Sequence, residues 1–428
     1  MPDKFNIKMS MKMSLNTQIL VAAVLGVLFG FLLNLFPQTT FEELSLYGLG
    51  IMSSIFIGLL KMLLVPLIFS SIVVGVSNLQ AGGQLSRTWK ITLACCVTTT
   101  TLALILGLAC AHLFDVGKGV DVVMFQDAMA QHKTPDTLTP SSFFTNFIQN
   151  TLINPFKAFA DGNVLAVVVF ALFVGVALVA GGDKFRTVRK LSIQFFDIMM
   201  LMIGWVMKLA PFGIFALLAK LIATEDISVL SRLAEFAAVV TGTTIFHGLV
   251  VLPLLLWIFG KMSPITFFKG TRAALITAFA TSSSSATMPL SMKCAQENLG
   301  VRPHTAGFVI PLGTQLNMDG TALYEAAAAL FIANLMGLDL TLGQQLVVCA
   351  TAMIASLGAP GIPSAGMVTM IMVLQSVGLP AEAIAILLPI DRLLDTVRTV
   401  VNVQGDMMIS VVVDRHTREP QLDQSISS

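Results

Sequence analysis

Apolar residues are grouped along the chain in stretches long enough to cross a lipid bilayer as helices, which requires about 20 residues each. The last two stretches differ from the others because polar and charged residues interrupt their middles. The pattern predicts an all-α membrane protein with eight transmembrane helices, near residues 17–37, 49–76, 91–113, 164–181, 193–222, 234–259, 305–337 and 380–413.

Two further segments, 273–292 and 344–377, have apolar arms too short to span a membrane. The first is broken by a serine cluster, Ser282 to Ser285, and a proline, and the second by the stretch SLGAPGIPSAG, residues 356–366. Irregular backbone at membrane depth is tolerated only where protein covers it or it lines a water-filled cavity. Both segments are therefore predicted to be re-entrant helical hairpins whose tips meet near the middle of the membrane.

Each predicted hairpin is followed by a span that an asparagine interrupts, so the same plan occurs twice, in residues 264–337 and 341–413. The first unit begins on the inner side of the membrane and the second on the outer side. Such inverted repeats place the substrate site of a transporter near the membrane midplane, between the repeats.

Lysine and arginine are concentrated in alternate loops. The loop after the fourth stretch contains Lys184, Arg186, Arg189 and Lys190, whereas the 115–140 loop is acidic. Because cytoplasmic loops carry the excess of basic residues, we expect both termini to be cytoplasmic. A short N-terminal segment and the absence of an N-x-S/T sequon point to a bacterial inner membrane.

Composition narrows the class of protein further. The chain has 428 residues, of which 55% are hydrophobic and only 11% are charged, against about 25% charged residues in soluble domains. Such a chain cannot cover a water-facing surface, and its net charge of +1 offers no basic face for nucleic acid. A soluble enzyme, a disordered scaffold and a nucleic-acid-binding protein are thereby excluded.

A stripe of polar residues follows one face of the last predicted span. At 3.6 residues per turn its members fall within an arc of roughly 80°. Ionisable groups inside a bilayer cost at least a few kcal/mol each and by default mark function. A purely structural ion-pair ladder would leave buried negative charge unpaired, because the stripe consists of Asp391, Asp395, Arg398, Asn402 and Asp406.

A second polar cluster interrupts the seventh predicted span. Asn317, Met318 and Asp319 precede Gly320, where we expect the helix to break, and Glu325 is a further buried acid. Exposed carbonyl, carboxylate and amide oxygens are suitable ligands for a hard monovalent cation, and the His and Cys ligands of a soft metal are missing. An alternative is that Asp319 simply caps the second half of the helix.

These charges suggest a coupled transport mechanism. Asp319, Asp395 and Asp406 exceed the single positive charge of Arg398. An arginine is a bidentate partner for a carboxylate, and Asp395 suits an ammonium group, so the pair fits an acidic amino acid. Cations would then neutralise Asp319 and Asp406, which predicts a symporter rather than an enzyme.

Two other functions stay open as alternatives. Ser282 to Ser285, with His247 as a base, could form an intramembrane serine hydrolase, but no nucleophile motif surrounds these serines. His247 is interpreted as a packing residue rather than a proton relay. The other function is an anion channel.

Four segments resemble signatures of the glutamate/aspartate transporter family, the dicarboxylate/amino acid:cation symporters. The similarity extends over residues 15–415, and the four segments are TSSSSATMP (281–289), NMDGTALYE (317–325), GAPGIPSAG (358–366) and DTVRTVVNVQGD (395–406). The resemblance implies a homotrimer of independent transport units that work by an elevator mechanism.

The resemblance also implies a division of each chain into two domains between cytoplasmic tails at 1–14 and 416–428. Spans 1, 2, 4 and 5 would form a scaffold and trimerisation domain, and spans 3, 6, 7 and 8 with both hairpins would form the moving transport domain. The scaffold would comprise 15–87 and 140–222, and the transport domain 88–114 and 230–415.

By position, the resemblance assigns a substrate site. Arg398 would bind the side-chain carboxylate of the substrate, Asp395 would bind its amino group, and both Asn402 and Thr399 would contact its main-chain end. The remaining contacts would come from Thr321 and, mainly through backbone of the two tips, from Ser283, Ser284, Ile362 and Gly366.

The resemblance further implies two or three co-transported sodium ions. One sodium site would use Gly313, Asn317, Asn402 and Asp406, and a second would use Thr99, Thr100, Asn317 and Asp319. A third would form from the backbone of Gln315, Ser356, Leu357 and Ala359 as the second hairpin closes.

Several positions depart from the pattern of the family. Ser282 and Thr396 stand where relatives carry an arginine, and Cys96 stands where a tyrosine often supports a sodium site. Glu325 resembles the animal members, in which this residue goes with proton coupling, whereas Asp406 favours sodium. A proton-coupled glutamate or C4-dicarboxylate symporter of the same fold stays open, as does the choice between aspartate and glutamate.

Overall fold

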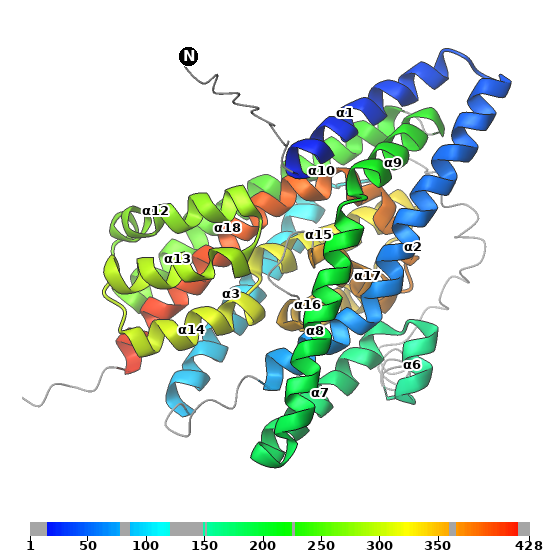
Figure 1. Ribbon diagram of the computed structural model, residues 1–428. Helices are drawn as coiled ribbons and strands as arrows, with labels where there is room; N and C mark the ends of the chain where they lie inside the picture. Colours follow the sequence, from blue (N-terminus) through cyan, green and yellow to red (C-terminus); the bar gives the residue numbers. More distant parts are fainter. Residues whose placement is uncertain are drawn as a thin grey trace, which may run out of the picture.

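The computed structural model describes residues 15–77, 86–119, 149, 152–224, 227–358 and 365–417, and every regular element in these ranges is a helix (Figure 1). The first half contains α1 (Leu15–Asn34), α2 (Thr40–Ser77), α3 (Ser86–Leu113), α6 (Pro155–Asp161), α7 (Val164–Gly181), η3 (Gly182–Phe185), α8 (Arg186–Met207), α9 (Ala210–Thr224) and α10 (Ile227–Phe246).

The second half continues from α10 through the π-helical turn η4 (His247–Val251), α11 (Leu252–Leu255) and a second π-helical turn, η5 (Leu256–Gly260). It then contains α12 (Pro264–Thr281), α13 (Ser284–Glu297), α14 (Pro303–Leu316), α15 (Asp319–Leu335), α16 (Leu342–Gly358), α17 (Ala365–Ser376), η6 (Ala381–Ala383) and α18 (Ile384–Thr417). The prediction of an all-helical protein is confirmed for the described residues.

Close backbone contact joins α1 to α9. A Cβ atom built on Gly26 would lie 2.7 Å from the Phe215 carbonyl oxygen, and one built on Gly30 would lie 2.5 Å from Ile222 Cβ. Small residues of this kind let apolar helices approach closely where lipid supplies no hydrophobic driving force. Helix α2 packs against α7, α8 and α9, so these helices form one contiguous group.

The predicted span 193–222 is divided between α8 and α9. The N–H groups of Lys208 and Leu209 bond to the carbonyls of Trp205 and Val206 at 3.1 and 2.9 Å, which tightens the last turn. Pro211 follows and cannot donate the next backbone hydrogen bond of a continuous helix. The span is therefore two successive helices, and both pack against α2.

The first predicted hairpin is the packed pair α12 and α13. Ser282 ends α12 with φ of 49°, a left-handed conformation that reverses the chain. Ser283 then caps α13 by accepting a hydrogen bond from the Ala286 N–H at 3.1 Å. The arms of the second hairpin are α16 and α17, which also pack together, while its tip lies outside the described residues. The re-entrant position of both hairpins stays a prediction.

The break predicted in the seventh span is confirmed, whereas the break predicted in the eighth is wrong. Helix α14 ends at Leu316 and α15 begins at Asp319. In contrast, α18 is continuous over 34 residues and passes through Asn402 without interruption. The physical reason is that the Asn402 side chain bonds to the start of α15 and leaves the backbone ladder of its own helix intact.

The chain is a multi-pass membrane protein. Helical stretches with the length and apolar composition of a membrane span are, within the described residues, Thr17–Asn34, Thr40–Ser77, Arg87–Leu113, Ala166–Met207 and Leu230–Gly260. The broken pair α14 and α15 and the charged helix α18 do not meet this simple criterion. The total of eight spans and the cytoplasmic position of the termini stay predictions.

Figure 1 shows two groups of helices on opposite sides of the molecule, with α15, α16 and α17 between them. Helices α12, α13 and α14 gather around the second half of α18 on one side, and α1, α2 and α9 gather on the other. This arrangement places the breaks and the polar face of α18 in the interior. The assignment of the two groups to a scaffold and a moving domain stays a prediction.

Candidate functional site

The polar stripe of α18 is buried, as the sequence predicts. Arg398 is 1% exposed and Asp406 is 2% exposed, whereas Leu393 on the opposite face is 57% exposed. An apolar residue on the outer face and charged residues on the inner face are the arrangement expected for a helix at the edge of a membrane protein interior. The stripe therefore faces α14 and α15, which both pack against α18.

Arg398 is held through one of its nitrogens. Nη2 donates to Asp391 Oδ1 at 2.7 Å and to Asp395 Oδ1 at 3.0 Å. Its Cζ atom lies 4.1 Å from the centroid of the Tyr324 ring, a cation–π contact. Nε and Nη1 have no hydrogen-bond partner among the described residues. Because an unsatisfied buried donor costs about 1–3 kcal/mol and more when charged, this side of the guanidinium is suited to an anionic partner.

Two glycines bring the neighbouring helices α15 and α17 close to Arg398. A Cβ atom on Gly320 would lie 2.7 Å from the Arg398 carbonyl oxygen, so only glycine allows α15 this close to α18. A Cβ atom on Gly366 would lie 3.1 Å from Thr321 Cγ2 and 3.4 Å from Arg398 Nη1. The structure thus brings the predicted residues Thr321, Gly366 and Arg398 together, from three different helices.

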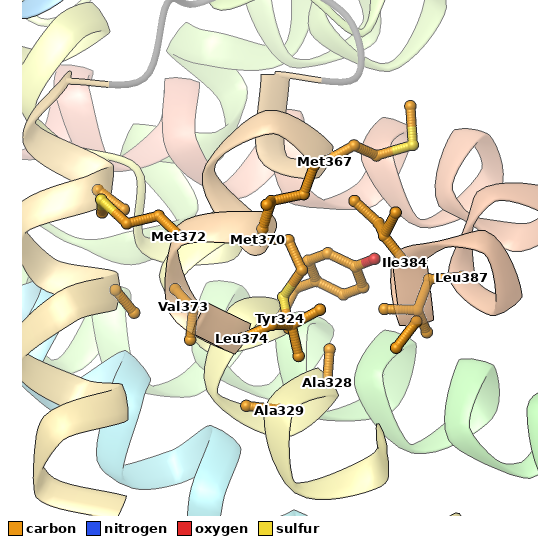
Figure 2. Packing of buried hydrophobic residues seen from close by; sticks show 14 of the residues in the cluster. Tyr324, Ala328, Ala329, Met367, Met370, Met372, Val373, Leu374, Ile384 and Leu387 are labelled. Atoms are coloured by element: carbon orange, nitrogen blue, oxygen red, sulfur yellow. The ribbon is translucent and has the colours of Figure 1, made fainter. Parts of the chain in front are cut away.

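Tyr324 joins this site to the apolar core. Figure 2 shows its ring among Met367 and Met370 of α17 and Ile384 and Leu387 of α18. The residue is fully buried, and its hydroxyl has no hydrogen-bond partner among the described residues. Sequence reasoning quoted Tyr324 within a motif without giving it a role. Its position next to Glu325 in an apolar helix offered no signal that it stacks on Arg398.

Sequence reasoning also missed two charged neighbours. It treated Arg398 as the single arginine of the stripe, yet Arg392 is only 9% exposed, and its Nη1 lies 3.5 Å from Asp395 Oδ2. Asp391 was placed on the stripe but given no function, although its spacing of seven residues from Arg398 puts the two side chains on one helical face. Asp395, predicted to bind an amino group, lies between both guanidinium groups.

Asn402 connects α18 with the start of α15. Its Oδ1 accepts a hydrogen bond from the Gly320 N–H at 2.8 Å, and its Nδ2 donates to Thr321 Oγ1 at 3.3 Å. Thr399, predicted to act with it, is buried at 5% exposure one turn earlier. The amide thereby fixes the position of Thr321 next to the arginine.

The second predicted cation site is assembled from α3 and the break between α14 and α15. Thr99 Oγ1 lies 3.1 Å from both Asn317 Oδ1 and Asp319 Oδ1, and Thr100 Oγ1 donates to Asp319 Oδ1 at 2.8 Å. The Asp319 carboxylate therefore points at these hydroxyl groups, and the side chain of Met318, the N-cap residue of α15, makes no capping hydrogen bond. The four predicted oxygen-bearing side chains converge in one buried place.

His247 is an unpredicted member of this cluster. Its Nε2 lies 3.3 Å from Asp319 Oδ2, and its side chain is fully buried. It begins the π-helical turn η4, a feature that often re-aims side chains at functional sites. The interpretation as a packing residue missed this contact, because periodicity does not reveal a π-turn. Within the described residues His247 makes no hydrogen bond to Ser282–Ser285, the contact that the alternative of an intramembrane serine hydrolase would need.

The first predicted cation site lies around Asp406. Its Oδ1 lies 3.4 Å from Asn317 Nδ2, and its Oδ2 lies 3.4 Å from Thr314 Oγ1. A Cβ atom on Gly313 would be 2.5 Å from Asp406 Oδ1, so the carboxylate reaches the backbone of α14. The Asn317 side chain directs its nitrogen toward Asp406 and its oxygen toward Thr99, so it connects the two predicted cation sites.

The third predicted cation site is only partly described. Helix α14, which carries the half-buried Gln315, packs against α16, which contains Leu357 and the fully buried Ser356. The hydroxyl of Ser356 donates to the Met353 carbonyl oxygen at 2.8 Å. Ala359 and the predicted substrate contact Ile362 lie outside the described residues.

The serines of the first hairpin tip are buried. Ser283 and Ser284 are 7% and 4% exposed, and both α12 and α13 pack against α18. The neighbouring Ser282 is 1% exposed, and its Oγ has no hydrogen-bond partner in the described part of the chain. A contact between these serines and a substrate stays a prediction.

Negative charge exceeds positive charge in this interior. Five buried acids around the site face two buried arginines, which leaves three negative charges in excess when all are ionised. Burying unpaired charge is costly, so cations or protons must compensate it. The acids are Asp319, Glu325, Asp391, Asp395 and Asp406, and the arginines are Arg392 and Arg398, while Asp414 pairs separately with Arg302.

A buried arginine with unused donors, together with buried clusters of oxygen-bearing and acidic side chains, is typical of a membrane transporter of small charged solutes. Comparison with known proteins gives the family. The chain belongs to the sodium:dicarboxylate symporter family, whose model matches residues 15–416. The resemblance noted from the sequence motifs is thereby confirmed, and the family name indicates a transporter rather than an enzyme.

Among similar proteins is a Caenorhabditis elegans excitatory amino acid transporter, 34% identical over 93% of this chain and 86% of the relative. Human excitatory amino acid transporter 3 is 33% identical over 95% of this chain and 86% of its own length. Human excitatory amino acid transporter 2 is 34% identical over 94% of this chain and 78% of the relative. The similarity therefore extends over nearly the whole chain.

Proposed function

We propose that the protein is a secondary active symporter that takes up L-aspartate or L-glutamate together with two or three sodium ions. The observation that carries the proposal is the buried guanidinium of Arg398, with Nε and Nη1 unpartnered within the described residues and the backbone of Gly366 close to Nη1. A planar guanidinium is the preferred partner of a carboxylate. The names of the family and of the similar proteins support both the sodium ion and the acidic amino acid.

In the proposed binding mode, Nη1 of Arg398 takes the side-chain carboxylate of the substrate. Asp395 exchanges one of its guanidinium contacts for the amino group, while Asp391 continues to hold Nη2 of Arg398. Thr321, Thr399 and Asn402 contact the substrate from the two neighbouring helices. The remaining contacts would come from the hairpin tips at Ser283, Ser284, Ile362 and Gly366.

The predicted cation sites would couple the transport of the substrate to the movement of sodium ions. Sodium ions bound near Asp319 and Asp406 would offset the excess of buried acid, so substrate and ions each lower the cost of burying the other. Each tenfold accumulation costs about 1.4 kcal/mol, and each net charge moved across 100 mV yields about 2.3 kcal/mol. Two or three sodium ions per substrate then drive accumulation on the order of 10⁴ or more.

The architecture and location complete the proposal. Three copies would form a homotrimer in the cell membrane with both termini in the cytoplasm. Within each copy, α3, α10 to α18 and both hairpins would move as an elevator against α1, α2 and α7 to α9, a division that the two groups of packed helices support. A bacterial inner membrane is retained as the proposed location.

A second candidate, a proton-coupled symporter of the same fold for glutamate or a C4-dicarboxylate, is favoured by one contact. Glu325 is fully buried and accepts a hydrogen bond from Thr369 Oγ1, and its Oε2 has no partner in the described part of the chain. A buried acid with a spare oxygen is a suitable proton site. We therefore include a proton on Glu325 in the proposed cycle beside the sodium ions.

Radiolabelled uptake into proteoliposomes tests the proposal. We expect aspartate and glutamate to accumulate when an inward sodium gradient is imposed, and not when lithium or potassium replaces sodium at the same pH. Uptake driven by a pH gradient without sodium would favour the proton-coupled alternative, and succinate uptake would favour the dicarboxylate. Absence of accumulation with every gradient would contradict symport.

A further inference from the structure

Thr369 connects the second hairpin with a charged residue of α15. Its Oγ1 donates a hydrogen bond to Glu325 Oε1, and both side chains are buried. The same Oγ1 lies 3.2 Å from the carbonyl oxygen of Gly366, in the first turn of α17. One hydroxyl group of the hairpin is thus shared between a carboxylate on a neighbouring helix and the backbone of its own helix.

These two acceptors compete for a single proton, because a threonine hydroxyl can donate only once. A hydrogen bond to an ionised carboxylate is roughly twice as strong as one to a neutral carbonyl. Ionised Glu325 therefore holds the Thr369 hydroxyl. Once protonated, Glu325 can donate to Thr369 Oγ1 itself, and the threonine proton becomes available to Gly366.

Gly366 lies at the substrate site, so a rearrangement there reaches the bound molecule. Its backbone is packed against Thr321 and against Nη1 of Arg398, the nitrogen proposed to bind the substrate carboxylate. Arg398 on α18 is also the charged group that acts electrostatically on Glu325 among the described residues. Tyr324, which precedes Glu325 in the chain, contacts the guanidinium of Arg398 through its ring.

We propose that Thr369 is the positioning residue through which the second hairpin responds to the charge of Glu325. With Glu325 ionised, the hydroxyl group ties α17 to α15. With Glu325 protonated, the hydroxyl group turns to the Gly366 carbonyl and tightens the first turn of α17 beside Arg398. Substrate affinity therefore depends on pH by way of Thr369. The inference rests on the proposed function, because it assumes that an acidic amino acid binds beside Arg398.

The test compares the pH dependence of KM and kcat for sodium-driven aspartate uptake in full-length wild type and variants. We expect the KM of the wild type to change across a pH series, and both Glu325→Gln and Thr369→Val to abolish that change. Thr369→Ser keeps the donor and should restore the wild-type pH profile, which a role in packing alone would not predict. If Thr369→Val fails to fold, Thr369→Ala removes the same hydroxyl group with less bulk.

Thr351→Val is the matched control. Thr351 is 1% exposed on α16, the other arm of the hairpin, and its Oγ1 has no hydrogen-bond partner within the described ranges, so this variant should keep the wild-type pH profile. The proposal is overturned if Thr369→Val retains the pH dependence of KM, or if the wild type has none, while sodium-driven uptake persists. Loss of sodium-driven uptake in the wild type would instead contradict the proposed function.

Discussion

The guanidinium of Arg398 is paired on one side and unsatisfied on the other, and this asymmetry makes a prediction about substrate charge. Arg398→Cys removes the anion partner while Asp391 and Asp395 stay buried. We expect the affinity for aspartate to fall by about 10- to 150-fold, since a hydrogen bond to a charged group contributes about 1.5–3 kcal/mol. The Arg398→Cys variant should also take up neutral amino acids, which can be measured by competition with labelled serine and alanine.

Arg302→Gln is the control for Arg398→Cys, because it also removes a positive charge but lies away from the candidate site. Arg302 binds Asp414 at 2.7 Å at the far end of α18, roughly 24 Å from Arg398 along the helix. This variant should lower thermal stability and leave the choice between aspartate and neutral amino acids unchanged. Unchanged aspartate affinity in Arg398→Cys, without any gain of neutral substrates, would remove Arg398 from the substrate site.

Asp406 gives the corresponding prediction for the cation. Asp406→Asn keeps the shape of the side chain and its contacts with Asn317 and Thr314 but removes the charge. We expect the sodium concentration for half-maximal uptake to rise by about tenfold, because one carboxylate ligand of a hard cation is lost. Asp414→Asn on the same helix is the control, and a sodium titration identical in the wild type and Asp406→Asn would exclude Asp406 as a ligand.

At the scale of helices, the close approach of α15 and α18 holds the site together. In Gly320→Ala, the added methyl group would lie 2.7 Å from the Arg398 carbonyl oxygen, which is backbone and cannot turn aside. Overpacking of this kind costs about 1–3 kcal/mol, so the midpoint of thermal unfolding in detergent should fall. In Gly307→Ala on α14, nothing lies within 4 Å of the added group, and its midpoint should stay or rise.

The sequence predicted the helices more completely than their breaks and irregular turns. The break at Asn317 was visible because polar residues and Gly320 stand together inside an apolar stretch. Asn402 is likewise a polar residue inside an apolar stretch, but its helix is continuous. Its side chain instead accepts a hydrogen bond from the Gly320 N–H at the start of α15, a contact between distant segments that a local sequence pattern cannot show. His247 was missed for a related reason, since a π-turn shifts the face on which a side chain lies.

In the candidate site too, the sequence predicted some residues and missed some of the contacts between them. The acids and Arg398 were predicted from spacing on one helix, and their burial confirms the stripe. The ion pair of Arg392 with Asp395 and the stacking of Tyr324 on Arg398 depend on side-chain direction across and within helices. Sequence spacing gives the face of a helix but not which of several neighbours a long side chain chooses.

For the whole molecule, the proposed coupling to several cations predicts that transport depends on membrane voltage. In the proposed cycle, two or three sodium ions and one proton accompany each anionic substrate, so two or three net positive charges would enter per cycle. Each net charge should change the equilibrium accumulation roughly 50-fold per 100 mV, since about 2.3 kcal/mol is available from it. An inside-negative potassium diffusion potential, set with valinomycin in proteoliposomes, should therefore raise aspartate accumulation, and an inside-positive one should lower it. Accumulation that does not respond to voltage would mean that charge movement is balanced, which contradicts coupling to more than one sodium ion.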